Sequence, residues 1–142
     1  MQEVKVMLKI FLSSHGHLAS GMKSSLDILA GESSKLTVFD AYVDEQSVKQ
    51  KLDEFYETVT DEDTVVLLSD LYGGSVNSTM YTYLTKKNTY LVAGINLAFL
   101  LEIVMQEEVT KESVANLVAQ SREMMCLVEL NTEEADEDED FL

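Results

Sequence analysis

Short apolar runs alternate along this chain with segments whose apolar residues recur at helical spacing. Four runs rich in β-branched and aliphatic residues predict strands, and they span residues 4–12, 36–39, 64–68 and 89–93. Apolar runs without polar alternation are typical of strands that are covered on both faces, as in a parallel sheet. A fifth apolar run, at residues 125–130, predicts a final strand.

Five amphipathic helices are predicted between and after these strands, because apolar residues there are spaced three or four positions apart. They cover residues 18–29, 48–59, 76–84, 97–106 and 111–121. Polar residues able to cap an N-terminus precede four of them, namely Asp44, Ser75, Asn96 and Thr110, and Gly31 marks the end of the first helix.

This order of elements predicts an α/β protein. Strand and helix alternate four times and are followed by a helix and a strand, which is typical of a doubly wound, mostly parallel sheet flanked by helices. We expect the common strand order 2-1-3-4. Ligands of such sheets bind beyond the carboxyl ends of the strands, where the winding direction reverses. That place lies between the loops that follow the first and third strands.

The length of 142 residues fits one domain, to which we assign residues 1–131. The last ten positions hold seven acidic residues and no basic one. Because such a run repels itself, we expect residues 132–142 to form a disordered, solvated tail, with docking of a partner as the less favoured interpretation.

Charge and cysteine content narrow the class of partner. The net charge of −16, from 26 acidic and 10 basic residues, argues against binding of nucleic acid or an anionic membrane and favours a partner with a basic patch. The single cysteine, Cys126, excludes an intramolecular disulfide and fits a reducing, cytoplasmic location. We expect Cys126 to be a small buried residue of the final strand. No apolar run approaches the roughly 20 residues of a membrane span, and we expect no signal peptide.

Candidate chemistry gathers in the loops that follow the first and third strands. His15 and His17, the two histidines, follow the first strand, and Asp70 and the segment Gly73-Gly74-Ser75 follow the third. A carboxylate that accepts the Nδ1 proton of a histidine leaves Nε2 free to attack an electrophile. Glycines before a helix allow an anion to approach the backbone closely. Together these groups suit one task, which is to carry a phosphoryl group on a histidine.

Each residue also has a less specific interpretation. His15 could be an exposed loop histidine, Asp70 could cap a turn, and Gly73-Gly74-Ser75 could simply begin a helix. His15, His17 and Asp70 could bind a metal, but the sequence offers no fourth ligand, so we expect no metal site.

Three motifs resemble the enzyme IIA domain of mannose-type (mannose/fructose/sorbose) sugar phosphotransferase systems. Residues 11–21 (FLSSHGHLASG) are similar to the family's apolar strand followed by Ser-His-Gly and Leu-Ala. Residues 69–77 (SDLYGGSVN) resemble its Asp-x-aromatic-Gly-Gly-Ser segment, and residues 92–97 (VAGINL) resemble its Gly-Ile-Asn turn. The motifs follow the order of the family and extend the resemblance over about residues 4–130.

The resemblance implies a role for several residues. His15 is the phosphorylated histidine, and Asp70 binds its Nδ1 side and leaves Nε2 as the acceptor. Gly73, Gly74 and Ser75 bind the phosphate oxygens, and Tyr72 lines a partner surface. The resemblance assigns no catalysis to His17, which occupies a variable position. Asn77 departs from the family's spacing and receives no role, and Asn96 is better explained as a helix cap.

The resemblance also implies partners. Phosphorylated HPr is the donor, enzyme IIB is the acceptor, and no cofactor, metal or nucleotide is needed for the transfer. The protein is a homodimer that meets the membrane only indirectly, through the IIC/IID permease. Residues 125–130 form an antiparallel strand that can be exchanged between subunits. Two alternatives remain at this point: the phosphocarrier subunit of a dihydroxyacetone kinase, and a non-catalytic regulatory module that binds partners through its acidic face.

Overall fold

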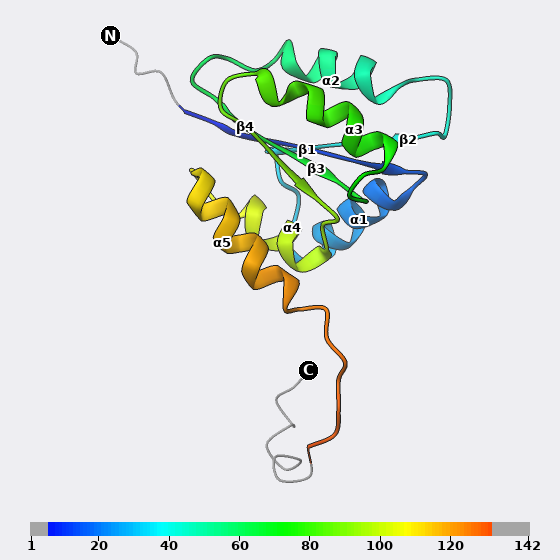
Figure 1. Ribbon diagram of the computed structural model, residues 1–142, viewed down its shortest axis with the longest axis vertical. Helices are drawn as coiled ribbons and strands as arrows, with labels where there is room; N and C mark the ends of the chain where they lie inside the picture. Colours follow the sequence, from blue (N-terminus) through cyan, green and yellow to red (C-terminus); the bar gives the residue numbers. More distant parts are fainter. Residues whose placement is uncertain (1–5, 132–142) are drawn as a thin grey trace.

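The computed structural model describes residues 6–131, which form a parallel sheet between two layers of helices (Figure 1). The predicted acidic tail lies outside these residues. The elements in chain order are β1 (Leu8–His15), α1 (Leu18–Ala30), β2 (Leu36–Ala41), α2 (Val48–Tyr56), β3 (Thr64–Ser69), α3 (Ser75–Tyr81), the 3₁₀ helix η1 (Thr82–Thr85), β4 (Thr89–Ala93), α4 (Leu97–Val104) and α5 (Lys111–Arg122).

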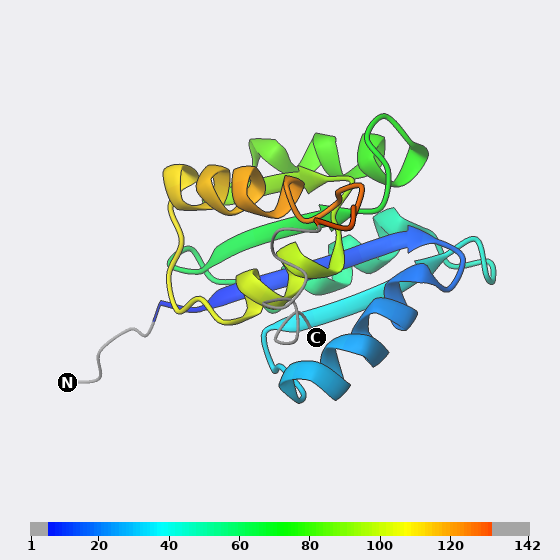
Figure 2. The same ribbon diagram turned by 90° about the horizontal axis from the view of Figure 1, so that it is seen from below.

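The described sheet has four strands in the order β2-β1-β3-β4, and every neighbouring pair is parallel. The strand order and the α/β class predicted from the sequence are therefore confirmed. Figure 2 shows β1 between β2 and β3, with α1, α4 and α5 lying across one face of the sheet. Because all four strands are parallel, their carboxyl ends meet at a single edge.

Alternate residues of each strand supply the two halves of the core. Ile10 and Leu12 pack with α1, α4 and α5, while Phe11 between them packs with α2 and α3 on the opposite face. In β3, Val66 and Val65 divide between the two faces in the same way. Burying each such side chain contributes about 1.5–3 kcal/mol, so both faces hold the central strands rigidly.

The first strand is displaced along the chain from its predicted position. The apolar pattern predicts a strand at residues 4–12, but β1 runs from Leu8 to His15, and residues 1–5 are not described. The polar Ser13 and Ser14 continue the strand because both are fully buried and hydrogen-bonded, Ser13 Oγ to the carbonyl of Phe39 and Ser14 Oγ to that of Gly16. His15 is therefore the last residue of a central strand and not part of a loop.

Two predicted helix caps are wrong. Asp44 does not cap α2, because Ser47 accepts from the amide of Gln50 and the Gln50 side chain accepts from the amide of Ser47, which satisfies two amides at once. The N-cap of α3 is Gly74, and Ser75 is its first helical residue. Asn96 and Thr110 cap α4 and α5 as predicted.

The predicted final strand is absent from the described residues. Residues 125–130 follow α5 as irregular backbone that extends away from the sheet (Figure 1). Their apolar side chains are exposed, with Met125 at 86% and Leu127 at 85%. Cys126 is exposed too, so its predicted burial is wrong. An apolar run becomes a buried strand only where a sheet edge pairs with it, and the single chain provides no such pairing here.

None of the helices within residues 6–131 is both long enough and apolar enough to cross a bilayer.

Candidate functional site

His15 and Asp70 meet where β1 and β3 end. The strands are paired in register from Leu8↔Thr64 to Ser13↔Ser69, so the residues after these positions lie side by side. One carboxylate oxygen, Asp70 Oδ2, accepts both the backbone amide and the ring Nδ1–H of His15, each at 2.9 Å. Asp70 therefore fixes the position of the imidazole and its tautomer together.

Asp70 is held in its ionised form by His15. Partial burial raises the pKa of Asp70, but hydrogen bonds from the His15 amide and ring outweigh it, so the pKa lies below its ordinary value. The Asp70 side chain is 10% exposed, whereas that of His15 is 43% exposed. The site thus joins a sheltered negative charge to an imidazole that a partner can reach.

The other ring nitrogen of His15 faces the start of α3. Nε2 lies 3.2 Å from Ser75 Oγ, and since Nδ1 carries the proton, the Ser75 hydroxyl donates to the lone pair of Nε2. Gly74 gives the ring room, because a Cβ there would stand 3.3 Å from His15 Cε1. The amide of Gly74 already donates to the carbonyl of Leu71 at 3.2 Å. Gly74 therefore contributes space, and the polar group beside Nε2 is the hydroxyl of Ser75.

Tyr42, which no motif of the sequence indicates, also belongs to this site. Tyr42 follows β2 directly and has a φ of 66°, a left-handed conformation that costs a bulky residue roughly 1–2 kcal/mol. Its ring stacks on the His15 imidazole with centroids 5.2 Å apart, and its hydroxyl lies 2.6 Å from Ser75 Oγ. The only feature of the sequence that could have indicated Tyr42 is the presence of an aromatic residue directly after β2.

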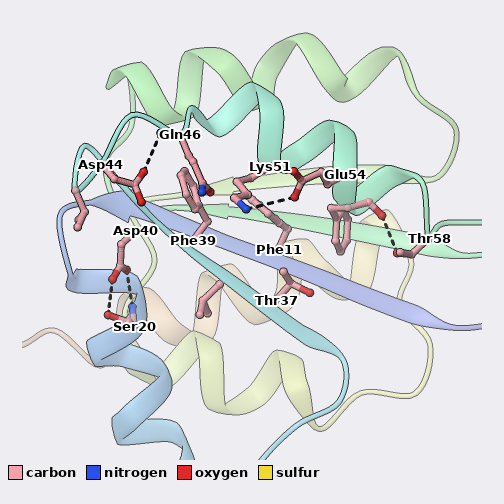
Figure 3. A pocket seen from close by; sticks show the side chains of 13 residues that line it. Phe11, Ser20, Thr37, Phe39, Asp40, Asp44, Gln46, Lys51, Glu54 and Thr58 are labelled. Atoms are coloured by element: carbon pink, nitrogen blue, oxygen red, sulfur yellow. Dashed lines mark hydrogen bonds and ion pairs between the residues drawn. The ribbon is translucent and has the colours of Figure 1, made fainter.

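His17 forms a second histidine–carboxylate pair, with Asp40 at the end of β2. The distance from His17 Nδ1 to Asp40 Oδ2 is 3.0 Å. Asp40 also accepts the amide of Ser20 at 2.9 Å and its hydroxyl at 2.6 Å, and these bonds are visible in Figure 3. Since Ser20 lies in the first turn of α1, Asp40 acts as a cap supplied by a neighbouring strand.

Hydrogen bonds hold Asp40 in its ionised form. Burial raises the pKa of Asp40, but bonds from Ser20 and His17 outweigh this effect and leave the pKa below its ordinary value. Its stabilising contribution is thus complete above the ordinary aspartate pKa of about 3.9. The contribution is lost as the pH falls through the lower pKa of the folded protein.

We expect Asp40→Ala to lower the free energy of unfolding by about 1–3 kcal/mol at pH 7, because the amide and the hydroxyl of Ser20 in the first turn of α1 lose their acceptor. Urea unfolding followed by circular dichroism measures this change. The matched control is Asp44→Ala, since within the described part of the chain Asp44 accepts only the amide of nearby Gln46, and its loss should cost less than about 0.5 kcal/mol. Equal stability of the two variants would show that Asp40 does not cap α1.

The remaining residues singled out from the sequence lie around this edge. Tyr72 is 83% exposed, and Gly73, with a φ of 78°, makes the turn between β3 and α3. Asn77 is buried and its Oδ1 accepts from Ser69 Oγ at 2.9 Å, which ties α3 to β3. Asn96 accepts the amide of Phe99 as the cap of α4, and it takes no part in the His15 site.

A groove of about 620 Å³ lies between β2 and α2, beside this site (Figure 3). Asp40 and Ser20 line one end of it, and the ion-paired Lys51 and Glu54 line another part. His15 does not line the groove. The chemistry of the site is therefore located on the open edge of the sheet and not in an enclosed cavity.

The two histidines face different carboxylates, so they do not converge on one point. Within residues 6–131 no group of three or more histidine, cysteine or acidic side chains is arranged to hold a metal ion. The site consists of the fixed imidazole of His15, the ionised carboxylate of Asp70 and the Ser75 hydroxyl beside Nε2. These groups suit covalent transfer to Nε2.

Comparisons with known proteins agree with this architecture. The family model described as PTS system fructose IIA component matches residues 9–121. The mannose/sorbose specific IIA subunit of the phosphotransferase system from Enterococcus faecalis is 22% identical, with a TM-score of 0.77 over 89% of this chain and 98% of that chain. The PTS IIA protein associated with the fucose utilization operon of Streptococcus pneumoniae is 19% identical, with a TM-score of 0.72 over 93% and 98%.

The phosphotransferase system component EIIA from Streptococcus agalactiae is 28% identical, with a TM-score of 0.68 over 85% of this chain and 97% of that chain. None of the curated proteins matches the chain significantly. The family match at residues 9–121 includes His15, Tyr42, Asp70 and Ser75. The chain therefore belongs to the mannose-type enzyme IIA family of the sugar phosphotransferase system.

Proposed function

We propose that the protein is the phosphocarrier of a sugar phosphotransferase system, which accepts a phosphoryl group from phosphorylated HPr on His15 and passes it to enzyme IIB. The observation that carries this proposal is that Asp70 Oδ2 accepts two hydrogen bonds from His15, one from its amide and one from Nδ1. Since Nδ1 then carries the proton, Nε2 is the ring nitrogen whose lone pair can attack. Membership of the enzyme IIA family supports a phosphotransferase component of this kind.

Transfer to His15 needs no external proton donor or acceptor. The lone pair of Nε2 attacks phosphorus in line, a new N–P bond forms, and the N–P bond to the donor histidine of HPr breaks. The donor ring leaves as neutral imidazole and keeps the proton on its other nitrogen. The His15 ring keeps its Nδ1–H and becomes a phosphoimidazolium, which carries a positive charge.

Asp70 stabilises that charge where it develops. Its ionised carboxylate lies 2.9 Å from Nδ1, so the attraction strengthens as the ring becomes cationic during transfer. The Ser75 hydroxyl, which donates to Nε2 in the free protein, turns to a phosphoryl oxygen when Nε2 is occupied. Gly73 and Gly74 leave space for the oxygens. The same geometry serves the second transfer, in which phosphorylated His15 is the donor and a histidine of enzyme IIB is the acceptor.

Exposed apolar side chains in the loops after β2 and β3 and at the start of α1 suit partners that dock transiently. Leu18, Val43, Leu71 and Tyr72 are between 47% and 83% exposed at this edge of the sheet. Exposed apolar groups close to a reactive residue are typical of interaction surfaces. The net charge of −16 favours carriers with a basic surface, and their encounter should slow as salt is added.

Intact-mass measurement tests the proposal. After incubation with phosphoenolpyruvate, enzyme I and HPr, the protein should gain the mass of one phosphoryl group, and addition of a sugar-specific enzyme IIB should remove it. Omission of HPr is the control and should leave the mass unchanged. Failure to gain mass with HPr present would favour a regulatory module. Transfer to a dihydroxyacetone kinase in place of enzyme IIB would assign the protein to that system.

We further propose that the protein is a homodimer in which residues 125–130 of each subunit add an antiparallel strand to β4 of the other. β4 is an edge of the described sheet. A groove of about 870 Å³ runs along it between α3 and α5, and Tyr90, Val92 and Val118 line this groove. The apolar side chains of residues 125–130, among them Met125 and Leu127, are exposed and could pack into this groove.

Leu127→Asp should weaken this dimer at least about tenfold, since it replaces a buried apolar contact by a charge in the groove. Light scattering coupled to size-exclusion chromatography over a concentration series measures the dissociation. Ile28→Asp is the matched control, because Ile28 is 82% exposed on α1, outside the groove, and its substitution should leave the dimer intact. A wild-type protein that is monomeric at high concentration would contradict the proposal.

A further inference from the structure

Tyr42 is an exposed aromatic residue whose backbone adopts a conformation that tyrosine disfavours. Its side chain is 67% exposed and its φ is 66°, in the left-handed region that glycine and asparagine adopt most easily. Burial therefore does not explain why this residue keeps its conformation. The recorded contacts of the side chain are the stacking on His15 and the hydrogen bond to Ser75. Unfavourable backbone geometry maintained by contacts with a reactive group indicates a functional role.

The hydroxyl of Tyr42 is one end of a chain of hydrogen bonds. The chain runs from Asp70 through both nitrogens of His15 to Ser75 Oγ at 3.2 Å and on to the Tyr42 hydroxyl at 2.6 Å. Because Asp70 is ionised, Nδ1 donates to it, and in the neutral ring that can attack phosphorus Nε2 accepts a hydrogen bond from the Ser75 hydroxyl. Ser75 Oγ then has only lone pairs to offer, so Tyr42 is the donor to it. Tyr42 thus determines where the Ser75 proton points.

The ring of Tyr42 stacks on the group that becomes charged. The two rings are inclined by only 17° and their centroids are 5.2 Å apart, so the imidazole and the phenol ring form an offset stack. The face of an aromatic ring is negative, and it attracts a cation within about 6 Å. Free His15 gains little from this contact while it is neutral. The phosphoimidazolium form gains more, because its ring is cationic.

We propose that Tyr42 is a positioning residue for phosphoryl transfer, whose ring stabilises the phosphorylated form of His15 and whose hydroxyl orients Ser75 toward the transferred group. This inference rests on the proposed function. When the bond from Nε2 to phosphorus forms, Nε2 no longer accepts, and the Ser75 hydroxyl keeps its proton and turns to donate a hydrogen bond to a phosphoryl oxygen. The bond from Tyr42 to Ser75 persists through that change and keeps Ser75 Oγ beside the phosphoryl group.

Two variants separate the ring from the hydroxyl. Tyr42→Phe keeps the stacking and loses the hydrogen bond, whereas Tyr42→Asn loses the stacking and keeps a residue that tolerates positive φ. With Tyr42→Asn we expect the equilibrium constant for transfer from phosphorylated HPr to fall about 3- to 30-fold. With Tyr42→Phe we expect the equilibrium to change by less than about twofold and the rate of transfer to fall about 3- to 10-fold.

The measurement is a quenched-flow and equilibrium titration of HPr against this protein, with both phosphorylated fractions read by intact mass. Ser75→Ala is the second background, because the effect of Tyr42→Phe should disappear when Ser75 has no hydroxyl to orient. A purely structural role would persist in that background, so an undiminished effect there would overturn the role of the hydroxyl. Urea unfolding should show that both Tyr42 variants are folded.

The outcomes distinguish this inference from the function on which it rests. If the wild-type protein never accepts a phosphoryl group, the proposed function fails. If it accepts one and both Tyr42 variants match it in rate and in equilibrium constant, the proposed function stands and the role of Tyr42 is wrong. If Tyr42→Asn lowers the rate but not the equilibrium constant, the stabilisation of phosphorylated His15 by the ring is wrong.

Discussion

Replacement of His15 by alanine is expected to abolish phosphoryl uptake completely. The proposed acceptor is Nε2, and alanine supplies no nucleophile in its place. Ser75 Oγ cannot substitute, because the side chains that contact it within residues 6–131 are His15, which this variant lacks, and the weakly basic hydroxyl of Tyr42. Incubation with phosphoenolpyruvate, enzyme I and HPr should therefore leave the mass of the variant unchanged, while the wild-type protein gains one phosphoryl group.

The fold should survive this substitution. The backbone amide of residue 15 can still donate to Asp70, and only the exposed ring's contacts with Asp70, Ser75 and Tyr42 are lost, at a cost of about 1–3 kcal/mol to the free energy of unfolding. Circular dichroism and urea unfolding check this. A loss of uptake that came from unfolding would be visible in the same measurements.

His17→Ala is the matched control for His15→Ala. His17 also has a carboxylate on its Nδ1, but Asp40 serves to cap α1, and no hydroxyl contact to His17 Nε2 is recorded among the described residues. The variant should accept the phosphoryl group at a rate within about twofold of the wild type, since its loss leaves the His15 site untouched. Phosphorylation of His15→Ala at His17 would contradict the assignment of the acceptor.

The proximity of His15 and Asp70 could be predicted because it depends on topology alone. His15 ends β1 and Asp70 follows β3, which the order β2-β1-β3-β4 makes neighbours, and apolar runs are sufficient to identify those two strands. The position of the strand end was harder to predict. Ser13 and Ser14 look like loop residues in the sequence, and only their buried hydrogen bonds extend β1 to His15.

Tyr42 and Asp40 could not be assigned from the sequence, for two physical reasons. Tyr42 contacts Ser75 with its backbone at a positive φ. Tyrosine disfavours this conformation, so the residue type at position 42 does not predict it. Asp40 caps α1 across the chain, from a strand 20 residues away from Ser20, whereas sequence signals for caps come from residues adjacent to the helix.

The last apolar run, at residues 125–130, shows what composition alone cannot predict. Residues 125–130 have the composition of a buried strand, yet Leu127 is 85% exposed in the single chain. Composition indicates that a segment needs cover, but it does not say whether the same chain provides it. The edge of β4 is one surface that can provide this cover, from a second copy of the chain.

Replacement of Asp70 by asparagine is expected to slow transfer to His15 by about 10- to 100-fold without removing the acceptor. The pKa of Asp70 lies below its ordinary value, so the wild-type side chain is fully ionised at pH 7 and the substitution removes a whole negative charge. Hydrogen bonds to charged groups are stronger than neutral ones by about 1–2 kcal/mol, and this advantage grows as the His15 ring becomes cationic. The rate is measured by quenched flow with phosphorylated HPr.

For Asp70→Asn, the rate of phosphorylation of His15 is more informative than its final extent. Asp70 Oδ1 is buried and has no hydrogen-bond partner among the described residues, so an amide nitrogen placed there would be unsatisfied. The other orientation points the amide nitrogen at Nδ1 and favours the tautomer whose Nε2 is protonated and cannot attack. Either orientation leaves some reactive His15, so phosphorylation should still approach completion when HPr is in excess.

Asp40→Asn is the matched control for Asp70→Asn, because it makes the same chemical change in the other histidine–carboxylate pair of this edge. It should lower stability through α1 while leaving the rate of transfer within about twofold of the wild type. If the two variants slowed transfer equally, the effect would reflect the net charge of the edge acting on the encounter with HPr, and added salt would remove it. Because Asp70 acts through a contact of 2.9 Å with Nδ1, its effect should persist at high salt, whereas the encounter itself slows.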